Sequence, residues 1–319
     1  MTRRRLALAA AGLVVLLLAA GAWLASSPAR LLSIAASIER GKADLEERRF
    51  SALGHDVVYL DGGEPDGPTV LLIHGFAADK DNWTRFAPAL AKAGYRVVAP
   101  DLPGHGEPSR LDAFTYDIPN QVAFVEALRA HLGVEAVHVV GNSMGGHVAA
   151  GYAAAHPDRT RTLGLFNAAG VTSPTPSERA RIVAETGDNP LLVTSAEDFD
   201  RLLAFLFVEP PKMPAAVKAH FANRAVTNRA FNDKIYGDLR DGRRLPLEPL
   251  LPSIATPTLV LWGDTDRVLD VSSVEVFTAG LPEAEAVILE ACGHAPMVER
   301  PGEAGEVYLD FLARKAPAG

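Results

Sequence analysis

The sequence predicts an α/β fold in which helices cover both faces of a largely parallel sheet, with one helical insertion and an apolar N-terminal segment. Three observations support this: apolar runs alternate with helical stretches after Phe50, the alternation breaks once between Gly170 and Pro257, and Leu6 to Ala25 carries no charge. Strands of a parallel sheet are buried on both faces, so they read as continuous apolar runs. A chain of 319 residues can bury a full core around such a sheet.

Residues 1–26 are predicted to form a membrane anchor. Arginines at positions 3–5 precede the apolar run, and twenty helical residues at about 1.5 Å rise span roughly 30 Å, one hydrocarbon core. The alternative is a cleaved signal peptide, whose apolar region is about 7–15 residues and ends in small residues such as Ala20-Gly21-Ala22. The arginines predict a cytoplasmic N-terminus and, for a bacterial inner-membrane protein with a single pass, a periplasmic main domain.

Residues 27–50 are predicted to be a juxtamembrane helix followed by a spacer. Ser27 can cap a helix and Pro28 suits its first turn. Between Glu39 and Arg49, four acidic residues balance four basic ones, so this stretch does not resemble a polybasic lipid-binding segment. We expect a solvated spacer here. Small residues in the apolar run, Ala7 and Ala11, would allow a weak homodimer through the N-terminal helix.

Two segments, 51–170 and 257–319, are predicted to build the sheet and its helices. Val57 to Leu60 is expected to be an outer strand. The expected core strands are Thr69 to Ile73, Arg96 to Ala99, Val137 to Val140, Thr162 to Phe166, Thr258 to Trp262 and Ala286 to Leu289. Helices are expected at Trp83 to Ala93 and Ile118 to Leu132, each ending at a glycine, and a third begins just after Ser143.

The interval 171–256 is too long for a simple connection between two core strands. It contains several prolines and a very apolar helical stretch from Phe199 to Phe207, which Pro210-Pro211 closes. We interpret it as an inserted helical cap, or lid, over the sheet. A second domain with its own core is the alternative, and the two overlap because a cap must also pack.

Charge and cysteine content exclude several classes of function. The formal net charge of -8 leaves no basic footprint, so we expect no nucleic-acid partner. The single cysteine, Cys292, excludes an intramolecular disulfide and zinc clusters of the multi-cysteine kind.

The segment Gly141-Asn142-Ser143-Met144-Gly145-Gly146 lies between an apolar strand and a helical run. This is G-x-S-x-G in the strand–turn–helix context that characterises a nucleophile elbow. Such a turn lifts the serine oxygen above the sheet edge, and its glycines let strand and helix approach closely. A serine hydroxyl is a weak nucleophile and needs a base, which in turn needs an orienting acid.

The C-terminal part supplies both partners after strand ends, in the chain order Ser, Asp, His expected of such an elbow. His294 follows the last predicted strand and is the predicted base, whereas His147 lies on the helix that leaves Ser143 and is expected to pack. Two aspartates compete for the orienting role: Asp264 could cap the turn, and Asp266 lies further along the loop.

A developing oxyanion requires two backbone N–H groups, one after the nucleophile and one in the loop after an earlier strand. Met144 and Phe76 fit these positions. The ring of His74 is expected to brace the second loop rather than to transfer protons. The predicted chemistry needs no metal and no cofactor.

These motifs resemble membrane-anchored monoacylglycerol lipases of the α/β-hydrolase superfamily and similar bacterial inner-membrane lipases and phospholipases A. The resemblance covers most of 57–312 and depends on His74-Gly75-Phe76, Gly141 to Gly146, Trp262 to Asp266 and Cys292-Gly293-His294. It implies the α/β-hydrolase fold, and it implies that Asp266 is the catalytic acid. The elbow also resembles that of carbon–carbon bond hydrolases, but the residues after His294 depart from the aromatic-rich stretch of those enzymes.

The expected function is therefore hydrolysis of a lipid ester, a monoacylglycerol, lysophospholipid or phospholipid, through an acyl-enzyme on Ser143. Asn142, Leu203 and Phe207 are the expected substrate contacts, and the bilayer is an expected partner. Two alternatives remain open: an exported esterase or carbon–carbon hydrolase for a soluble molecule, and a binding protein without turnover.

Overall fold

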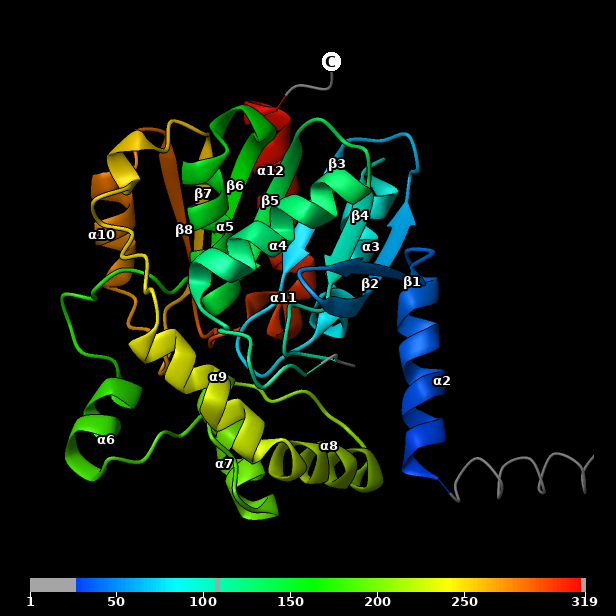
Figure 1. The fold of residues 1–319 in the computed structure, drawn as a ribbon, viewed down its shortest axis with the longest axis vertical. Coiled ribbons are helices and arrows are strands. Elements are labelled where there is room, and N and C mark those ends of the chain that lie inside the picture. The colour runs from blue at the N-terminus through cyan, green and yellow to red at the C-terminus, as the bar shows by residue number, and fades with distance from the viewer. Residues whose placement is uncertain (1–26, 107–109, 317–319) are drawn as a thin grey trace, which may run out of the picture.

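The computed structural model describes residues 27–106 and 110–316, which form an eight-stranded sheet with helices on both faces and a group of helices below it (Figure 1). The strand order is β1-β2-β4-β3-β5-β6-β7-β8. The predicted anchor, 1–26, lies outside the described residues. Within the described part of the chain, no helix has the length and hydropathy needed to cross a bilayer.

The sheet is parallel from β4 to β8, as predicted. Neighbouring strands among β4, β3, β5, β6, β7 and β8 all pair in parallel, whereas β2 is antiparallel to both β1 and β4. The strands are β1 (Glu46–Ala52), β2 (His55–Gly63), β3 (Thr69–Ile73), β4 (Arg96–Pro100), β5 (Val137–Asn142), β6 (Thr160–Phe166), β7 (Thr258–Gly263) and β8 (Ala284–Leu289).

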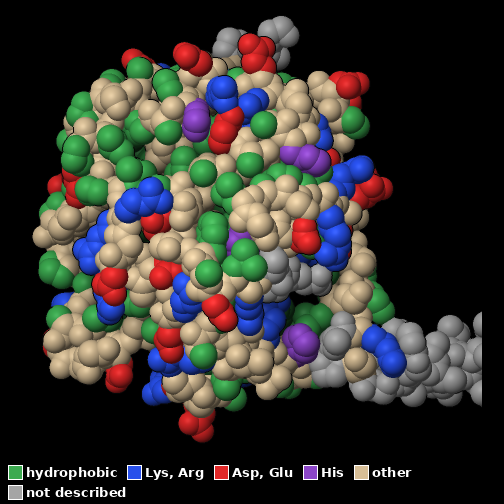
Figure 2. Space-filling view, in the orientation of Figure 1, with side chains coloured by type: hydrophobic (Ala, Val, Ile, Leu, Met, Phe, Trp, Pro, Cys, Tyr) green, Lys and Arg blue, Asp and Glu red, His purple; other side chains and the backbone are tan. Residues whose placement is uncertain are grey.

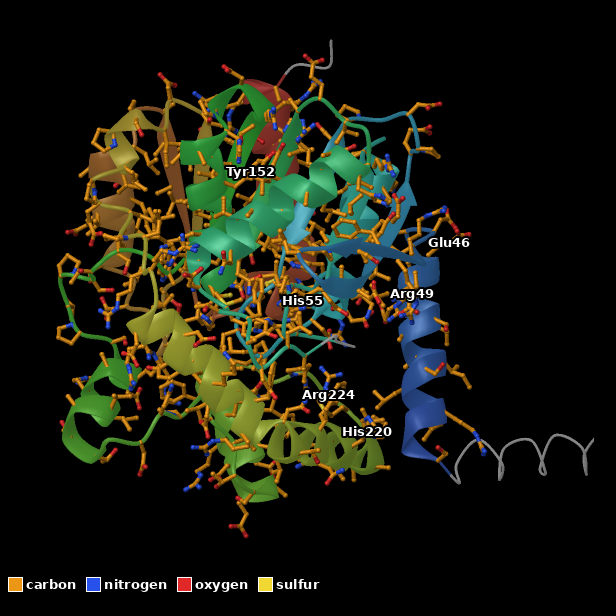
Figure 3. All side chains as sticks on the ribbon, in the orientation of Figure 1. Glu46, Arg49, His55, Tyr152, His220 and Arg224 are labelled. Carbon is orange, nitrogen blue, oxygen red and sulfur yellow. The ribbon has the colours of Figure 1, made fainter. Side chains whose placement is uncertain are left out.

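The segment expected to be a spacer, 27–50, is more structured than predicted. Helix α2 (Pro28–Gly41) occurs where the sequence indicated, but Glu46–Ala52 is an edge strand of the sheet. The charged residues of this strand suggested a solvated segment because their side chains are exposed, among them Glu46 and Arg49, which Figure 3 labels. Phe50 is the one buried residue of the strand. Arg40 at the end of α2 pairs with Asp81 at 2.7 Å, so this helix is attached to the domain.

Successive residues of the central strands bury themselves in two different cores. Leu71 and Ile73 of β3 pack with α4 (Ile118–His131), α5 (Met144–Ala155) and α10 (Ser273–Gly280). Val70 and Leu72 pack on the other face with α3 (Ala87–Lys92) and α12 (Pro301–Lys315). Burial on both faces is the reason that these strands appear as uninterrupted apolar runs. Three short helical turns add buried residues, η1 (Lys80–Trp83), η3 (Leu251–Ser253) and α11 (Pro296–Glu299), whereas η2 (Pro157–Arg159) buries none.

The interval 171–256 is helical and lies below the sheet in Figure 1. Its α-helices are α6 (Glu178–Thr186), α7 (Ala196–Leu206), α8 (Ala215–Thr227) and α9 (Arg229–Asp241), and η3 lies near its end. A small core of its own joins Val193, Phe199 and Ala222. Basic and acidic side chains alternate over its surface (Figure 2), in pairs such as Arg229–Asp233 and Lys234–Asp238.

Candidate active site

Ser143 lies in a strained turn between β5 and α5. Its backbone has φ 56° and ψ -121°, and its N–H donates to the carbonyls of Phe166 and Asn167, both at 3.1 Å. A Cβ on Gly141 would lie 2.0 Å from the Gly145 carbonyl oxygen, and one on Gly145 would lie 2.2 Å from that of Ile73. Both positions therefore require glycine. Strain of this kind is characteristic of functional turns.

The loops after β7 and β8 bring Asp266 and His294 together. His294 Nδ1 donates to Asp266 Oδ2 at 2.8 Å, and the side chain of Asp266 is completely buried. Its other oxygen, Oδ1, accepts the N–H groups of Val268 at 2.8 Å and Leu269 at 3.1 Å. Asp264 is exposed and accepts a hydrogen bond from its neighbour Thr265. The structure thus places Asp266, not Asp264, beside the imidazole.

Asn167 is a residue of this site that the sequence analysis missed. It follows β6 with φ 45°, and its Nδ2 donates to Asp266 Oδ2 at 2.7 Å and to the Gly293 carbonyl at 3.4 Å. The N–H of Gly263 donates to its Oδ1 at 3.4 Å. Asparagine tolerates positive φ better than other side chains. In the sequence, only its position could have indicated this role, because Asn167 follows the carboxyl end of the strand next to the elbow strand.

Asn142, a predicted substrate contact, makes hydrogen bonds within the protein. Its side chain is buried, and Nδ2 donates to the carbonyls of Phe166 at 3.0 Å and His294 at 2.9 Å. It therefore joins the elbow strand to the histidine loop. Both amide hydrogens are used within the protein, so Asn142 supports the geometry of the site.

The two predicted substrate residues of the cap differ in their surroundings. Leu203 packs against the small cap core, whereas Phe207 packs against the core beneath α3 and α12. The N–H of His294 donates to the Leu206 carbonyl at 2.7 Å, so the end of α7 is attached to the histidine loop. Leu202, one residue before Leu203, lines the cap cavity described below.

The predicted oxyanion donors lie on the two sides of the elbow. A Cβ on Gly75 would lie 3.2 Å from Ser143 Cβ, so the loop that carries Phe76 passes directly beside the serine. Met144 is the first residue of α5. Within 27–106 and 110–316, neither the Phe76 nor the Met144 N–H donates a hydrogen bond. Both groups are therefore available to an anion, and a helix N-terminus favours one there.

His74 braces the Phe76 loop, as expected. Its Nδ1 donates to the Gly75 carbonyl at 2.8 Å, and its Nε2 accepts the Leu102 N–H at 2.9 Å. Burial lowers the pKa of His74 to about 4, so the ring stays neutral and keeps both bonds. His147 also packs, because its Nε2 donates to the Leu245 carbonyl at 2.7 Å. Among the described residues, no His, Cys, Asp and Glu side chains gather in a group that could hold a metal ion.

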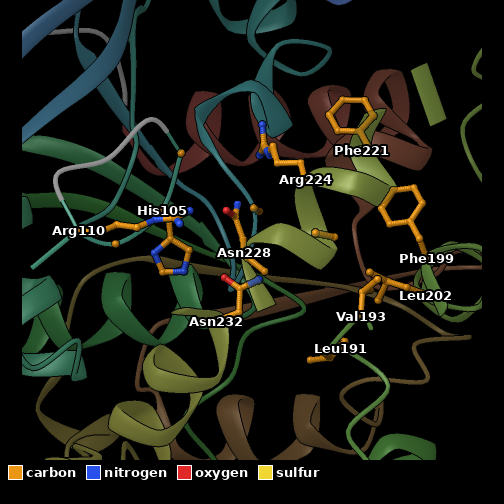
Figure 4. Close-up of a pocket in the computed structure, with 15 residues that line it drawn as sticks. His105, Arg110, Leu191, Val193, Phe199, Leu202, Phe221, Arg224, Asn228 and Asn232 are labelled. Carbon is orange, nitrogen blue, oxygen red and sulfur yellow. The ribbon is translucent and has the colours of Figure 1, made fainter. Parts of the chain in front are cut away.

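A cavity of about 110 Å³ lies between the cap and the loops beside Ser143 (Figure 4). Ala77 and Ala78, which directly follow Phe76, form part of its wall, and Gly104 to Gly106 form another part. Arg110 contributes a further part, and the cap supplies the remainder from α7, α8, α9 and the segment before α7.

Comparisons with known proteins agree with this geometry. The chain is 36% identical to Lipase 1 of Psychrobacter immobilis over 86% of each protein, and 30% identical to monoacylglycerol lipase ABHD6 of Mus musculus over 77% of this chain and 76% of the relative. It is similar to the crystal structure of a membrane phospholipase A, described as a bacterial virulence factor, with a TM-score of 0.89 and 47% identity over 99% of this chain and 100% of that one. Residues 68–301 match the family of the α/β hydrolase fold. With this sheet, this elbow and these relatives, the chain belongs to the α/β-hydrolase family.

Proposed function

We propose that this protein hydrolyses carboxylic esters of lipids, with Ser143 as nucleophile, His294 as base and Asp266 as the acid that orients it. The contact that carries the proposal is the 2.8 Å bond between His294 Nδ1 and the buried Asp266. It leaves the other ring nitrogen, Nε2, unprotonated in the neutral imidazole, and this is the atom that accepts a serine proton.

The proposed reaction has two halves. In the first, Ser143 Oγ attacks the ester carbonyl while His294 Nε2 takes its proton, and the N–H groups of Phe76 and Met144 stabilise the oxyanion. The protonated imidazole then donates to the leaving alkoxide, and an acyl-enzyme remains. In the second half, water repeats the attack with His294 as base, and fatty acid is released. The charge of Asp266 stabilises the imidazolium in both halves.

Two observations favour a lipid ester. The names of the relatives describe a lipase, a monoacylglycerol lipase and a phospholipase A, all of which act on esters of lipids. The cap also presents apolar side chains to the cavity beside the site, from Leu191, Val193, Phe199 and Leu202. An acyl chain between cap and sheet would be removed from water by these groups.

We further propose that residues 1–26 anchor the protein in the bacterial inner membrane, with the N-terminus in the cytoplasm and the active site in the periplasm. A lipid substrate has a low aqueous concentration, so tethering raises its encounter with the enzyme. The proposal predicts that the full chain sediments with membranes and that protease added to spheroplasts cleaves its main domain. Recovery of a shortened chain that lacks the N-terminal apolar segment in the soluble periplasmic fraction would indicate a cleaved signal peptide. The proposed weak homodimer through this segment would be seen by crosslinking in membranes.

Ser143→Ala tests the proposed reaction. The variant is expected to lose fatty-acid release from short p-nitrophenyl esters, because no other group replaces Oγ, while its thermal unfolding stays that of the wild type. Retained activity would reject the nucleophile. Wild-type rates on a monoacylglycerol, a lysophospholipid and a dienone ring-cleavage product, measured side by side, test the substrate class. Preference for the dienone would support the carbon–carbon hydrolase alternative instead.

A further inference from the structure

The cavity beneath the cap has a polar half and an apolar half (Figure 4). His105, Arg110, Asn228 and Asn232 gather at one end, and Phe199, Leu202 and Val193 lie at the other. Arg224 lies between them, beside Phe221. Such a gradient fits an amphiphile whose head and tail are close together.

Among the lining residues that the structure describes, the polar half carries positive charge and no carboxylate. The guanidinium carbon of Arg110 stands 4.8 Å above the centre of the Phe231 ring, and among the described residues no carboxylate contacts this guanidinium. Arg224 pairs through Nη2 with Asp79 at 2.5 Å, which leaves other N–H donors of its fork for a ligand. Burial and the charge of Arg224 lower the pKa of Arg110, so the two cations lie near one another, while Asp79, Asp101 and Asp81 raise the pKa of Arg224.

Hydrogen-bond donors surround the same end. Asn228 and Asn232 are one turn apart where α8 passes into α9, and both side chains line the cavity. His105 is 4% exposed, and its Nδ1 donates to the Pro103 carbonyl at 3.1 Å, so its buried Nε2, which has no partner among the described residues, is an acceptor. A negatively charged group that accepts hydrogen bonds would satisfy the arginines and the asparagine amides, and a hydroxyl beside it could donate to His105 Nε2.

The polar half lies close to the reacting serine. The wall residues Ala77 and Ala78 follow Phe76 directly, and the ring of Phe76 is 6.2 Å from that of His105. The Phe76 loop in turn passes beside Ser143. A ligand whose ester reached Ser143 would therefore place its nearby substituents against this cluster of donors.

From these observations, and given the proposed ester hydrolysis, we infer that the cavity binds the phosphate of a glycerophospholipid whose acyl ester reaches Ser143. In such a lipid the phosphate and the ester are attached to one glycerol backbone. Arg110 and Arg224 would hold the phosphate oxygens, and the asparagines would add neutral hydrogen bonds. Arginine suits this task because its planar fork matches phosphate oxygens. A monoacylglycerol has no anion to place there, so the cavity distinguishes the two substrates.

The test compares two substrates with the same acyl chain, a 1-acyl-glycerophosphoglycerol and a 1-monoacylglycerol. Arg110→Gln is expected to lower kcat/KM for the phospholipid roughly tenfold, the loss of one charge-assisted hydrogen bond, and to leave the monoacylglycerol nearly unchanged. Arg110→Lys is expected to fall between, because lysine keeps the charge without the fork. Arg201→Gln is the matched control, since Arg201 is an exposed arginine of α7 outside the cavity.

A second variant and an inhibition assay complete the test. Asn232→Leu removes a neutral donor and is expected to reduce the phospholipid preference in the same direction, so the inference does not depend on the folding of one variant. Glycerol 3-phosphate is expected to inhibit monoacylglycerol hydrolysis by the wild type and more weakly by Arg110→Gln.

Three results would overturn the inference while ester hydrolysis stood. The first is an equal effect of Arg110→Gln on both substrates, and the second is no effect on either. The third is that Arg110→Gln loses inhibition by added free fatty acid while its ratio of kcat/KM for the phospholipid to kcat/KM for the monoacylglycerol stays that of the wild type. That result would assign the cavity to the carboxylate of the fatty-acid product. Activity retained in Ser143→Ala would instead reject the underlying reaction.

Discussion

Asp266→Asn tests the assignment of the catalytic acid between two aspartates, Asp264 and Asp266, that the residue pattern without the family resemblance did not separate. The Asp266 carboxylate accepts four hydrogen bonds: two N–H groups, from Val268 and Leu269, on Oδ1, and His294 Nδ1 and Asn167 Nδ2 on Oδ2. An asparagine must keep its oxygen toward the two backbone donors. Its NH₂ would then face His294 and Asn167, where two donors already point.

The imidazole can relieve this conflict only by changing its tautomer. If Nδ1 becomes the acceptor, the proton moves to Nε2, which then cannot take the proton of Ser143. In the serine proteases the equivalent change lowers kcat about 10⁴-fold, so we expect a loss of roughly 10³- to 10⁴-fold, about 4–5.5 kcal/mol in the activation free energy. The expected KM for a short p-nitrophenyl ester changes little.

Asp264→Asn is the matched control. Asp264 is exposed and accepts hydrogen bonds from Thr265 and, at 3.4 Å, from the Cys292 N–H of the histidine loop. An asparagine oxygen can accept both, so the amide variant is expected to keep kcat within about threefold. Initial rates with p-nitrophenyl butyrate, together with thermal unfolding of both variants, provide the measurement. The assignment is refuted if Asp266→Asn keeps more than a tenth of wild-type kcat while folded, or if Asp264→Asn loses as much as it does.

Three further predictions concern packing, pH and metals. Gly145→Ala should destabilise the protein by roughly 1–3 kcal/mol and lower its activity, because the new Cβ would lie 2.2 Å from the Ile73 carbonyl oxygen. The Cβ of Gly302→Ala in α12 would meet nothing within 4 Å, so this variant should stabilise the protein by roughly 0.5–1 kcal/mol. Denaturant unfolding measures both changes, and equal effects of the two variants would contradict the steric reasoning. Burial lowers the pKa of His138 to about 4, so between pH 7 and pH 4 the unfolded chain binds a proton at this residue and the folded chain does not. At pH 5 this difference lowers the free energy of unfolding by about 2 kcal/mol. His138→Gln should therefore lose correspondingly less stability than the wild type between pH 7.5 and pH 5, and an equal loss in the two proteins would count against the assignment. Dialysis against EDTA should leave ester hydrolysis unchanged, and a loss restored by added metal would show that the proposed reaction is incomplete.

The strands and the nucleophile elbow could be predicted from the sequence because the patterns that indicate them are local. Burial of each central strand on both faces produces an apolar run, and the elbow requires glycines at Gly141 and Gly145 wherever the strand and helix meet. Sequence patterns therefore predicted six parallel strands nearly to the residue. They failed at β1, where solvent exposure on an edge strand leaves only Phe50 as a signal.

The sequence by itself determined the class of fold, the nucleophile candidate and the histidine that follows the last strand. The family resemblance pointed to Asp266 as the acid, but only the tertiary structure shows that Asp266 and not Asp264 meets that histidine, because the two share one loop and differ in the direction that the turn gives each side chain. The same holds for Asn142, whose amide joins two loops far apart in the chain, and for Asn167, which no motif marks. Contacts between residues distant in sequence arise when strands and loops pack at one edge of the sheet, so a local sequence pattern cannot predict them.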